Sequence, residues 1–329
     1  MGASAELISD VGEFGLIARI GAALDGQSGG GVRVGLGDDA AVVDAPGDRL
    51  VVSTDMLVEG RHFRRDWSTG ADVGAKAAAQ NLIDVAVMGA RGTTLVVALG
   101  LPADLPVEWV VDFYQGLRSE AGAQGATIVG GDVVRSDRVT VSVTALGTLT
   151  GPAPILRSGA QPGDVVAVAG RLGWAAAGLS ILSRGFRTPR ALVDGQRRPM
   201  PPYAAAAAAA AAGATAMIDV SDGLVGDLGH VARASRVAIE IDPSQLVVDE
   251  PVASAAAAFN ADPLVWVLTG GEDHAVAATF PPSAAIPPEF TVIGSVSEPA
   301  DVEVLLGAPG VTVAGRVPRG GGGHDHFAG

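Results

Sequence analysis

The sequence predicts an α/β (α+β) protein of two domains. Apolar runs of strand length alternate with longer segments of helical periodicity, which is typical of this class. The length of 329 residues fits about two domains of roughly 100–200 residues each. A segment rich in proline and glycine, 150–162, separates the halves. We therefore expect an N-terminal domain over 1–150 and a C-terminal domain over 151–329.

The first half predicts helices separated by short strands. The apolar residues Phe14, Ile17, Ile20 and Leu24 recur at helical spacing, and a glycine-rich turn follows them. In chain order we expect a helix over 12–24, strands over 32–34, 41–43 and 50–53, a helix over 71–88, a strand over 94–99, a helix over 107–121, and strands over 127–129 and 139–146.

The second half continues the alternation, without a repeat of fixed period. An alanine run over 204–212 favours a helix by intrinsic propensity. In chain order we expect a strand over 164–169, a helix over 173–183, a polar connection over 184–202, a helix over 203–212, a strand over 216–220, a helix over 222–234 capped by Ser221 or Asp222, and strands over 238–241, 264–268, 275–279, 291–296 and 302–306.

Composition disfavours several classes of function. The net charge is −14, from 22 Lys+Arg and 36 Asp+Glu, which disfavours binding to nucleic acid or an anionic membrane. Cysteine is absent, which removes disulfides, thiolate metal sites and thiol nucleophiles. The first ten residues lack the basic region of a secretory signal, and no apolar run reaches the roughly 18 residues of a membrane span. We expect a soluble cytoplasmic protein.

Two common nucleotide-binding patterns are disfavoured. Lys76 is the only lysine and stands in Gly-Ala-Lys-Ala, so the Gly-Lys-Ser/Thr of a Walker-type loop is missing. Residues 35–40 match G-x-G-x-x-A weakly, but Asp38 and Asp39 occupy the place where a pyrophosphate would lie. A nicotinamide or flavin site is therefore the less favoured interpretation.

Five short acidic motifs indicate a metal-dependent phosphate site. They lie at predicted strand ends or on one helix: Gly37-Asp38-Asp39-Ala40, Ser53-Thr54-Asp55, Asn81-Leu82-Ile83-Asp84, Gly130-Gly131-Asp132 and Asp219-Val220-Ser221-Asp222-Gly223. Carboxylates brought together repel one another. Mg²⁺ relieves this repulsion and often bridges protein carboxylates to phosphates. The alternative for any single motif is an aspartate that only makes a turn or caps a helix.

Three further residues are candidates for contacts with a ligand. His62 follows the Ser-Thr-Asp motif, Glu272 stands after a Gly-Gly turn, and Arg157 lies at the predicted domain boundary. An arginine can bind two phosphate oxygens at once. A surface histidine and a lone surface arginine are the alternatives. No nucleophile with a base at a known spacing is present.

In this order the motifs resemble those of the thiamine-monophosphate kinases, within the superfamily of aminoimidazole ribonucleotide synthetase. The resemblance also includes Gly12–Ile17, Met56–Phe63, Arg157–Gly159 and Asp325–Phe327, and spans nearly the whole chain. It implies two α/β domains, with the N-terminal sheets of two subunits paired into a barrel and a mixed C-terminal sheet. It implies a homodimer that transfers the γ-phosphoryl of ATP directly to thiamine monophosphate, with several Mg²⁺ ions.

The resemblance also implies roles for individual residues. The implied catalytic residues are Asp39, Asp55, Asp84, Asp132, Asp219 and Asp222. The implied metal ligands are these six with Ser53 and Thr54. The implied ATP contacts are Tyr114, Gly131, Asp132, Arg157 and Ser221, and the implied substrate contacts are His62, Glu272 and Phe327. The family usually has an aromatic residue where this chain has His324.

Other members of the superfamily fit less well. Selenophosphate synthetase needs a reactive Cys or selenocysteine, and the hydrogenase-maturation relative ends in a cysteine, whereas this chain has no cysteine. An enzyme similar to aminoimidazole ribonucleotide synthetase and a non-catalytic nucleotide-binding module remain as alternatives.

Overall fold

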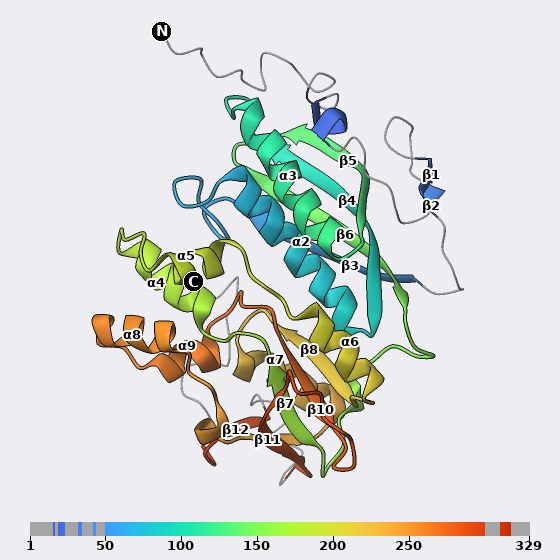
Figure 1. Ribbon diagram of the computed structural model, residues 1–329, viewed down its shortest axis with the longest axis vertical. Helices are drawn as coiled ribbons and strands as arrows, with labels where there is room; N and C mark the ends of the chain where they lie inside the picture. Colours follow the sequence, from blue (N-terminus) through green and yellow to red (C-terminus); the bar gives the residue numbers. More distant parts are fainter. Residues whose placement is uncertain are drawn as a thin grey trace. The chain divides into compact units, whose positions relative to one another are not determined.

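The computed structural model describes residue 16 and residues 19–23, 32–34, 42–43, 50–299 and 310–316. The chain forms two compact units. Unit 1 comprises residues 1–85 and 91–149, and unit 2 comprises residues 86–90 and 150–329. Each unit contains its own sheet (Figure 1). The α/β class predicted from the sequence is confirmed.

Unit 1 contains a four-stranded sheet in the order β3-β6-β4-β5. Strand β3 pairs antiparallel with β6, and β4 pairs parallel with β5. A separate pair, β1 with β2, is antiparallel. The strands of this unit are β1 (Val32–Val34), β2 (Val42–Val43), β3 (Leu50–Val58), β4 (Ala90–Leu101), β5 (Thr127–Arg135) and β6 (Thr140–Leu149).

Two strands that carry acidic motifs are longer than the sequence predicts. Strand β3 continues to Val58 rather than ending at Ser53, and β5 continues to Arg135 rather than ending at Val129. The acidic residues Asp55 and Asp132 therefore lie within strands and not at strand ends. Polar side chains are tolerated there because they are at most partly buried, so they do not interrupt the ladder of backbone hydrogen bonds.

Helices α2 (Gly70–Val87) and α3 (Val107–Ala123) cover one face of this sheet (Figure 1). Their backbones approach very closely where both contribute glycines. A Cβ atom at Gly74 would lie 1.9 Å from the carbonyl oxygen of Phe113, and one at Gly116 would lie 2.0 Å from that of Ala71. Glycine is required at both contacts because any side chain would push the helices apart.

The other face of the same sheet is apolar and exposed. Side chains alternate between the two faces of a strand, and this face carries Leu50, Val52 and Met56 of β3, Val96 of β4 and Val134 of β5, all exposed. No helix of the described part of unit 1 covers it. Apolar surface of this extent on a sheet is typical of an interaction face.

Unit 2 contains a six-stranded mixed sheet in the order β12-β9-β11-β7-β10-β8. Strand β12 is parallel to β9, and the other neighbouring strands are antiparallel. The mixed character of this sheet agrees with the prediction. Its strands are β7 (Val165–Ala169), β8 (Ala216–Val220), β9 (Ala238–Ile241), β10 (Ala275–Phe280), β11 (Thr291–Ser297) and β12 (Val311–Val313).

The helices of unit 2 pack around this sheet. They are α4 (Trp174–Ser183), α5 (Arg190–Arg197), α6 (Tyr203–Ala211), α7 (Leu224–Ser235), α8 (Glu250–Phe259), α9 (Pro263–Thr269) and the 3₁₀ turns η1 (Arg157–Gly159) and η2 (Pro243–Gln245). Helix α7 contributes the buried Leu224, Leu228 and Val231 to a core that includes Ile218 and Ile239 of the strands. The core fixes the strand ends that carry Asp219 and the loop after it.

One predicted strand of unit 2 is a helix. The run over 264–268 is rich in β-branched and apolar residues, which favours a strand, but it forms α9. The side chain of Asp262 accepts a hydrogen bond from the backbone N–H of Leu264 at 3.0 Å, and Pro263 occupies the first turn. This N-terminal cap decides the local structure against the β propensity.

Other differences concern helices and strands that the sequence did not predict. Helix α5 lies within the predicted polar connection, α8 precedes α9, and β12 follows the region predicted as a strand over 302–306, which is outside the described residues. Helix α7 begins at Leu224 rather than at Asp222, and neither Ser221 nor Asp222 caps it through its side chain.

None of the helices described is by itself long and apolar enough to cross a membrane. The pair formed by α8 and α9 meets the length and composition test only when the two are taken together, and it is bent by 120°.

Candidate functional site

Strand β3 and helix α2 bring together three of the predicted residues of unit 1. Ser53 donates a hydrogen bond from Oγ to Oδ2 of Asp84 at 2.7 Å. The backbone N–H of Asp55 donates to Oδ1 of Asn81 at 3.0 Å, and Nε2 of Gln80 donates to Oδ2 of Asp55 at 3.1 Å. The predicted grouping of Ser53, Asp55 and Asp84 is therefore present as a set of neighbouring oxygen donors.

The other two predicted metal ligands of this sheet are placed differently. The side chain of Thr54 points to the opposite face of β3 from those of Ser53 and Asp55, where its Oγ1 donates to the carbonyl oxygen of Val143 at 3.0 Å. Its hydroxyl therefore does not join the cluster around Asp84. Asp132 is exposed on the edge strand β5, and its Oδ1 accepts from the backbone N–H of Val133 at 2.9 Å.

His62 is held in a turn after β3 by its own ring. Nδ1 accepts a hydrogen bond from the backbone N–H of Val58 at 2.9 Å. In the neutral ring the proton is therefore on Nε2, which makes this atom a donor. The buried Nζ of Lys76 donates to the carbonyl oxygen of His62 at 3.2 Å. The single lysine of the chain thus supports the turn that carries a predicted substrate contact.

Asp219 in unit 2 is buried and paired with a histidine. It lies within strand β8, and its Oδ2 is 3.0 Å from Nδ1 of His274, the residue just before β10. The side chains of both residues are 6% exposed. His274 was not assigned a role from the sequence, although it directly follows the Gly-Gly-Glu-Asp motif.

The loop after β8 is held by a third aspartate. Oδ2 of Asp227 accepts from the backbone N–H groups of Asp222 and Gly223, each at 3.0 Å. Asp227 therefore caps α7 from within the helix, in place of the predicted Ser221 or Asp222. Burial, together with the charges of Asp219 and Asp222, raises the pKa of Asp227 to about 7. Negative charge is thus concentrated at this end of β8.

The loop that carries Glu272 is tied to the loop that carries Ser221. The backbone N–H of Glu272 donates to the carbonyl oxygen of Ser221 at 2.7 Å. A Cβ atom at Gly271 would lie 2.5 Å from that same oxygen. Glu272 has a φ of +65°, which is uncommon for a residue with a side chain. The tight backbone contact explains this conformation, and it sets Glu272 beside the Ser-Asp-Gly turn.

Asp273 connects this loop to helix α4. Its buried carboxylate accepts from the backbone N–H groups of Gly173 at 2.5 Å and Ala175 at 2.7 Å. Burial raises the pKa of Asp273 to about 7, although these two hydrogen bonds act in the opposite direction. Asp273 therefore serves as the cap of α4, which explains why a carboxylate is present in this buried position.

Arg157 lies on the turn η1 and is exposed, which leaves its guanidinium accessible. Its carbonyl oxygen accepts from Oγ of Ser235 on α7 at 2.8 Å. The pKa of His230 on the same helix is lowered, by burial first and then by the charges of Arg233 and Arg157. The charge of Asp222 acts on the pKa of His230 in the opposite direction.

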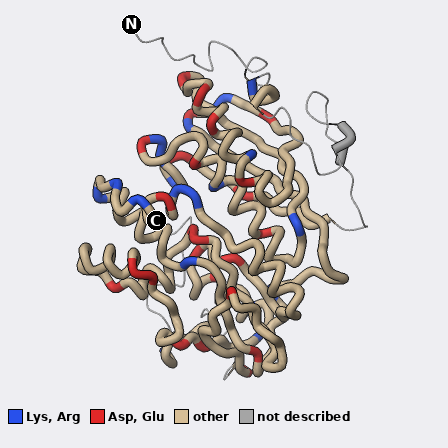
Figure 2. The backbone as a smooth tube through the Cα atoms, viewed as in Figure 1, with Lys and Arg blue, Asp and Glu red and all other residues tan. Residues whose placement is uncertain are grey.

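Many of the other basic residues of unit 2 lie in the segment that follows α4. Figure 2 shows them on the segment between α4 and α5 and on α5 itself. Several are arranged in local contacts, such as Arg190 with Asp194 at 3.4 Å and Arg184 stacked over the ring of Phe259 at 4.4 Å. These arginines were not predicted to bind a ligand.

Tyr114 does not have the position that was expected of an ATP contact. It is 3% exposed on α3, and its ring packs edge-on against Phe113 at 5.3 Å between centroids. Burial raises its pKa far above the ordinary value. Its ring is part of the core of unit 1, so it is not available to stack on a base there. Asp39, His324 and Phe327 lie outside the described residues.

Gly131 has a structural reason to be glycine. It pairs with Val97 across β4 and β5, and a Cβ atom at this position would lie 1.7 Å from the carbonyl oxygen of Val97. The parallel pairing therefore requires glycine at 131. An additional role for its backbone toward ATP stays a prediction.

The donor set fits magnesium held jointly with phosphates. Among the described residues, no three His, Asp or Glu side chains form a group that could hold a metal ion alone. Mg²⁺ usually keeps several waters and binds one or two carboxylates together with substrate phosphates. Ser53 with Asp84, and Asp219 near Asp222, supply only oxygen donors of this kind. A soft metal would require thiolates, which the chain lacks.

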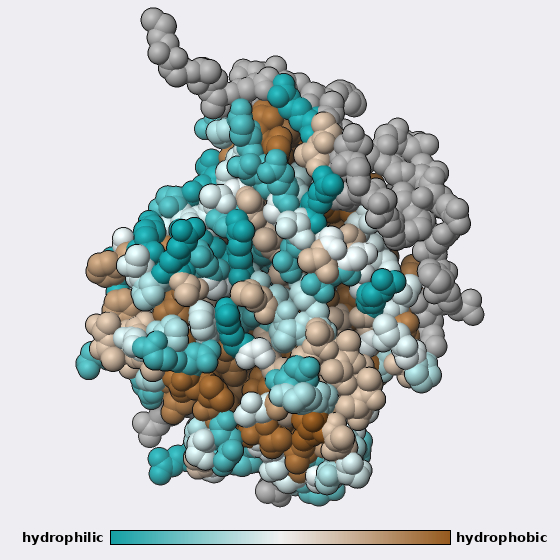
Figure 3. Space-filling model, in the orientation of Figure 1, coloured by the Kyte–Doolittle hydropathy of each residue, from teal (hydrophilic) through white to brown (hydrophobic). Residues whose placement is uncertain are grey.

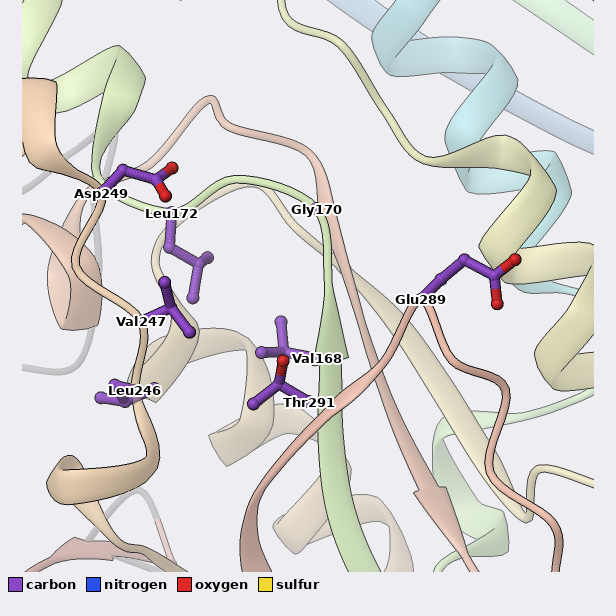
Figure 4. Close-up of a pocket in the computed structure, with 8 residues that line it drawn as sticks. All are labelled: Val168, Gly170, Leu172, Leu246, Val247, Asp249, Glu289 and Thr291. Atoms are coloured by element: carbon purple, nitrogen blue, oxygen red, sulfur yellow. The ribbon is translucent and has the colours of Figure 1, made fainter.

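A pocket elsewhere in unit 2 has a different character. It has a volume of about 180 Å³ and lies beside β7 and β11. Figure 4 shows Leu172, Val247 and Val168 around it, with Asp249 and Glu289 at its edges. Asp249 accepts from Nε1 of Trp174 at 2.6 Å. Figure 3 shows apolar surface near α9 in the same unit. None of the predicted site residues lines this pocket.

Several residues that organise the site were given no role from the sequence. Asn81 was quoted only as the first residue of the motif that ends at Asp84, one helical turn later on the same face of α2. Asp227 and Asp273 look like any other aspartate in a glycine-rich segment, because their partners are backbone groups that only the fold supplies. His274 and Lys76 become recognisable only through their neighbours in space.

Two family models match the chain. The N-terminal domain of the AIR synthase related proteins matches residues 37–149, and their C-terminal domain matches residues 161–307. Thiamine-monophosphate kinase of Mycobacterium tuberculosis is 47% identical over 299 residues, covering 90% of this chain and 89% of that protein. The enzyme of Corynebacterium glutamicum is 39% identical, covering 88% of each chain.

Solved structures agree with these relatives. A structure of AaThiL complexed with AMPPCP and TMP has a TM-score of 0.78 and 32% identity, and the match covers 99% of this chain and 100% of that one. A crystal structure of thiamine monophosphate kinase from Aquifex aeolicus has a TM-score of 0.75 and 32% identity, covering 84% and 91%. A hydrogenase maturation protein HypE in complex with ATP shares the fold at 20% identity.

Proposed function

The chain belongs to the thiamine-monophosphate kinase family of the AIR synthase related proteins, and on this premise we propose how its residues carry out the reaction. The reaction is the ATP-dependent phosphorylation of thiamine monophosphate to thiamine diphosphate. The relative complexed with AMPPCP and TMP, an ATP analogue and the acceptor, matches nearly the whole of both chains. The single observation that carries the residue assignment is the group of oxygen donors formed by Ser53, Asp55 and Asp84.

We assign the role of Mg²⁺ ligands to carboxylates of both units. In unit 1 these are Asp55 and Asp84, with Ser53 adjacent, and in unit 2 they are Asp219 and Asp222. Two observations support this assignment. The donors are all oxygens, and the charges of Asp219 and Asp222 add to the effect of burial in raising the pKa of Asp227. A bound cation would compensate these charges.

Asp132, Arg157 and Ser221 are retained as proposed contacts of ATP, with the backbone of Gly131. The exposed guanidinium of Arg157 suits a phosphate, which accepts two parallel hydrogen bonds from arginine. Asp39 and Thr54 stay on the list of proposed metal ligands from the family resemblance alone, since Asp39 lies outside the described residues and the hydroxyl of Thr54 faces away from Asp84. Tyr114 is omitted because its ring is buried.

The chemistry needs no nucleophilic side chain. The acceptor is a phosphate oxygen, which is already nucleophilic, so catalysis consists mainly of positioning and neutralisation of charge. Mg²⁺, when bound, supplies that neutralisation at the phosphoryl oxygens. Hydrogen bonds hold the proposed ligands in place. Ser53 donates to the carboxylate of Asp84, and the carboxylate of Asp227 accepts from the backbone N–H of Asp222. The transfer is direct and in line, and no phospho-enzyme forms.

His62 and Glu272 are proposed to bind thiamine monophosphate, together with Phe327. The neutral His62 ring presents Nε2 as a donor because Nδ1 already accepts from Val58. Glu272 is set beside the Ser221 turn by a backbone hydrogen bond and a strained φ, and such strain is frequent at ligand-binding positions. A carboxylate there suits the cationic thiazolium ring of thiamine.

A homodimer is proposed from the open face of the unit 1 sheet. Leu50, Val52, Met56, Val96 and Val134 expose apolar surface that a second copy of the same sheet would cover. Pairing of two such faces into a barrel is what the family resemblance implies. We expect the reaction to take place in the cytoplasm, where ATP is available as co-substrate.

A coupled assay of ADP release tests the proposed function. ADP is measured with ATP and Mg²⁺ in the presence and absence of thiamine monophosphate, with thiamine and the aminoimidazole precursor as controls. We expect stimulation by thiamine monophosphate alone. Stimulation by the aminoimidazole precursor instead would transfer the chain to the alternative enzyme class. Absence of stimulation by any acceptor would refute a kinase function while leaving the fold unaffected.

A further inference from the structure

Asp219 on β8 and His274, just before β10, are connected by a side-chain hydrogen bond, and a backbone hydrogen bond links the same two segments. Nδ1 of His274 lies 3.0 Å from Oδ2 of Asp219. The backbone N–H of His274 also donates to the carbonyl oxygen of Val220, at 2.9 Å. The imidazole is therefore fixed relative to β8, the strand that carries Asp219, at two points.

The environment of the pair makes a donor to Asp219 necessary. Both side chains are only 6% exposed, so a carboxylate oxygen there that lacked a donor would carry the cost of burial without compensation. His274 has a φ of +53°, a conformation in which histidine, asparagine and aspartate are enriched relative to other residues with side chains. The residue at position 274 must therefore accept a positive φ and place a nitrogen donor where Nδ1 of His274 lies.

We propose that His274 is a positioning residue for Asp219: it holds Oδ2 and so fixes the carboxylate in the orientation that binds the divalent cation. This inference deepens the proposed function and rests on the assignment of Asp219 as a metal ligand. Partners that orient metal ligands commonly contribute about 10- to 100-fold to metal affinity. His274 therefore contributes to cation binding without contacting the cation or either substrate.

The geometry distinguishes two conservative substitutions. The side-chain nitrogen of asparagine lies near the place of Nδ1, whereas that of glutamine lies near the place of Nε2. Because Oδ2 of Asp219 is bonded to Nδ1, His274→Asn keeps a donor at the required place and His274→Gln does not. Asparagine also accepts a positive φ readily. A structural role that depended only on filling space would favour the larger glutamine.

The test is a titration of the full chain with MnCl₂, in the presence and absence of AMPPCP, with unbound Mn²⁺ measured by electron paramagnetic resonance. The proteins are the wild type, His274→Asn, His274→Gln and Asp219→Asn, each with its melting temperature recorded. We expect His274→Gln to weaken Mn²⁺ binding about 10- to 100-fold, and His274→Asn to stay within about threefold of the wild type. In the assay, His274→Gln should raise the Mg²⁺ concentration for half-maximal rate more than it lowers the rate at saturating Mg²⁺.

The outcomes separate this proposal from the proposed function. If Asp219→Asn weakens Mn²⁺ binding but His274→Gln does not, the positioning role is refuted and the metal role of Asp219 stands. If Asp219→Asn itself leaves Mn²⁺ binding unchanged, the metal assignment fails and the positioning role fails with it. Equal loss of Mn²⁺ affinity in His274→Asn and His274→Gln also refutes the proposal, since it would show that the Nδ1 donor does not matter. Should His274→Gln not fold, the comparison of His274→Asn with the wild type still decides: a loss greater than about threefold overturns it.

Discussion

Ser53 on strand β3 donates a hydrogen bond of 2.7 Å to the carboxylate of Asp84 on helix α2. The two residues are 31 positions apart in the sequence, and the next residue on the same face of the strand, Asp55, is held by Gln80 and Asn81 of the same helix. The oxygen donors of β3 and α2 thus lie together, between one face of the strand and the side of the helix that packs on it. The motifs Ser53-Thr54-Asp55 and Asn81-Leu82-Ile83-Asp84 derive their arrangement from this pairing.

Replacing Asp84 by asparagine should abolish turnover while the fold persists. The substitution keeps the size and the acceptor for Ser53 but removes the charge that a divalent cation needs. The loss should exceed the about 10- to 100-fold that removal of an outer partner costs, because a direct ligand is lost. The rate of ADP formation at saturating substrates measures the effect, and circular dichroism with the melting temperature reports the fold.

The matched control for this change is Asp104→Asn. Asp104 is an exposed carboxylate of the same unit, in the loop before α3, and its replacement should leave the rate within about twofold, as for a surface change. If Asp84→Asn retained a rate close to that of the wild type, Asp84 could not be a ligand of a catalytic metal.

A charge on the open face of the unit 1 sheet should dissociate the proposed dimer. Val52 is 58% exposed on this face, on strand β3, and Val52→Glu would place an unpaired carboxylate in the proposed interface. An interface position of this kind is worth about 2 kcal/mol or more, or roughly 30-fold in the dissociation constant. Sedimentation equilibrium or light scattering after size exclusion measures the mass against protein concentration.

Val247→Glu is the control for this prediction. Val247 is 63% exposed in unit 2, so the same change is made at a similarly exposed valine outside the face. It should leave the mass unaltered. A wild-type chain that is monomeric at every concentration would contradict the prediction, and so would a Val52→Glu variant that stays fully dimeric.

The sequence was sufficient for the class of fold and for most elements, for identifiable reasons. Helix α2 and strand β7 lie within one residue of the ranges predicted for them, 71–88 and 164–169, and the acidic motifs are visible in the order of the residues. The extent of β3 could not be predicted from local signals, because Ser53, Thr54 and Asp55 resemble the end of a strand until the pairing with β6 is known. Helix α9 required recognition of the Asp262 cap against five residues of strand-like composition.

The residue types of the candidate site could be predicted from the sequence, but the residues that hold them in place could not. The residues Ser53, Asp55 and Asp84 were named from motifs, and the structure places them together. Asp227 and His274 were not named, because a cap formed from inside a helix and a pair across two strands depend on contacts between distant parts of the chain. The burial of Tyr114 in the core likewise depends on the packing of α3.

The buried Asp273 should make stability depend on pH. Burial raises its pKa to about 7 from an ordinary 3.8. Between these values the folded state keeps a proton that the unfolded state has released, so stability falls as the pH rises through this window. The slope attributable to one proton is at most about 1.4 kcal/mol per pH unit. Asp273→Asn cannot release this proton, so its stability should fall less steeply between pH 4 and pH 7.

Urea denaturation at several pH values measures this difference. Asp227, whose pKa is also raised to about 7, is present in both proteins and cancels in the comparison. Asp242→Asn is the control with the opposite sign, because hydrogen bonds from Ser244 lower the pKa of that exposed carboxyl. Its effect should appear only at acidic pH, as stability is lost below the ordinary pKa. Parallel curves for the wild type and Asp273→Asn would show that Asp273 has an ordinary pKa.

Gly131→Ala should destabilise unit 1 even if Gly131 never contacts ATP. The added Cβ atom would lie 1.7 Å from the carbonyl oxygen of Val97, and neither backbone can yield without breaking the pairing of β4 with β5. Overpacking of this kind costs about 1–3 kcal/mol. Urea denaturation measures the loss, and the affinity for AMPPCP is measured separately by calorimetry at a temperature where the variant is folded.

Gly122→Ala in helix α3 is the matched control for this last change. A Cβ atom there meets nothing within 4 Å, and alanine is favoured over glycine in a helix by up to about 1 kcal/mol, so this variant should be as stable as the wild type or slightly more stable. If Gly131→Ala were equally harmless, the strands would have to separate at no cost, contrary to the contact with Val97. If the variant lost stability but bound AMPPCP normally, the glycine would serve the sheet alone, and Gly131 would leave the set of proposed ATP contacts.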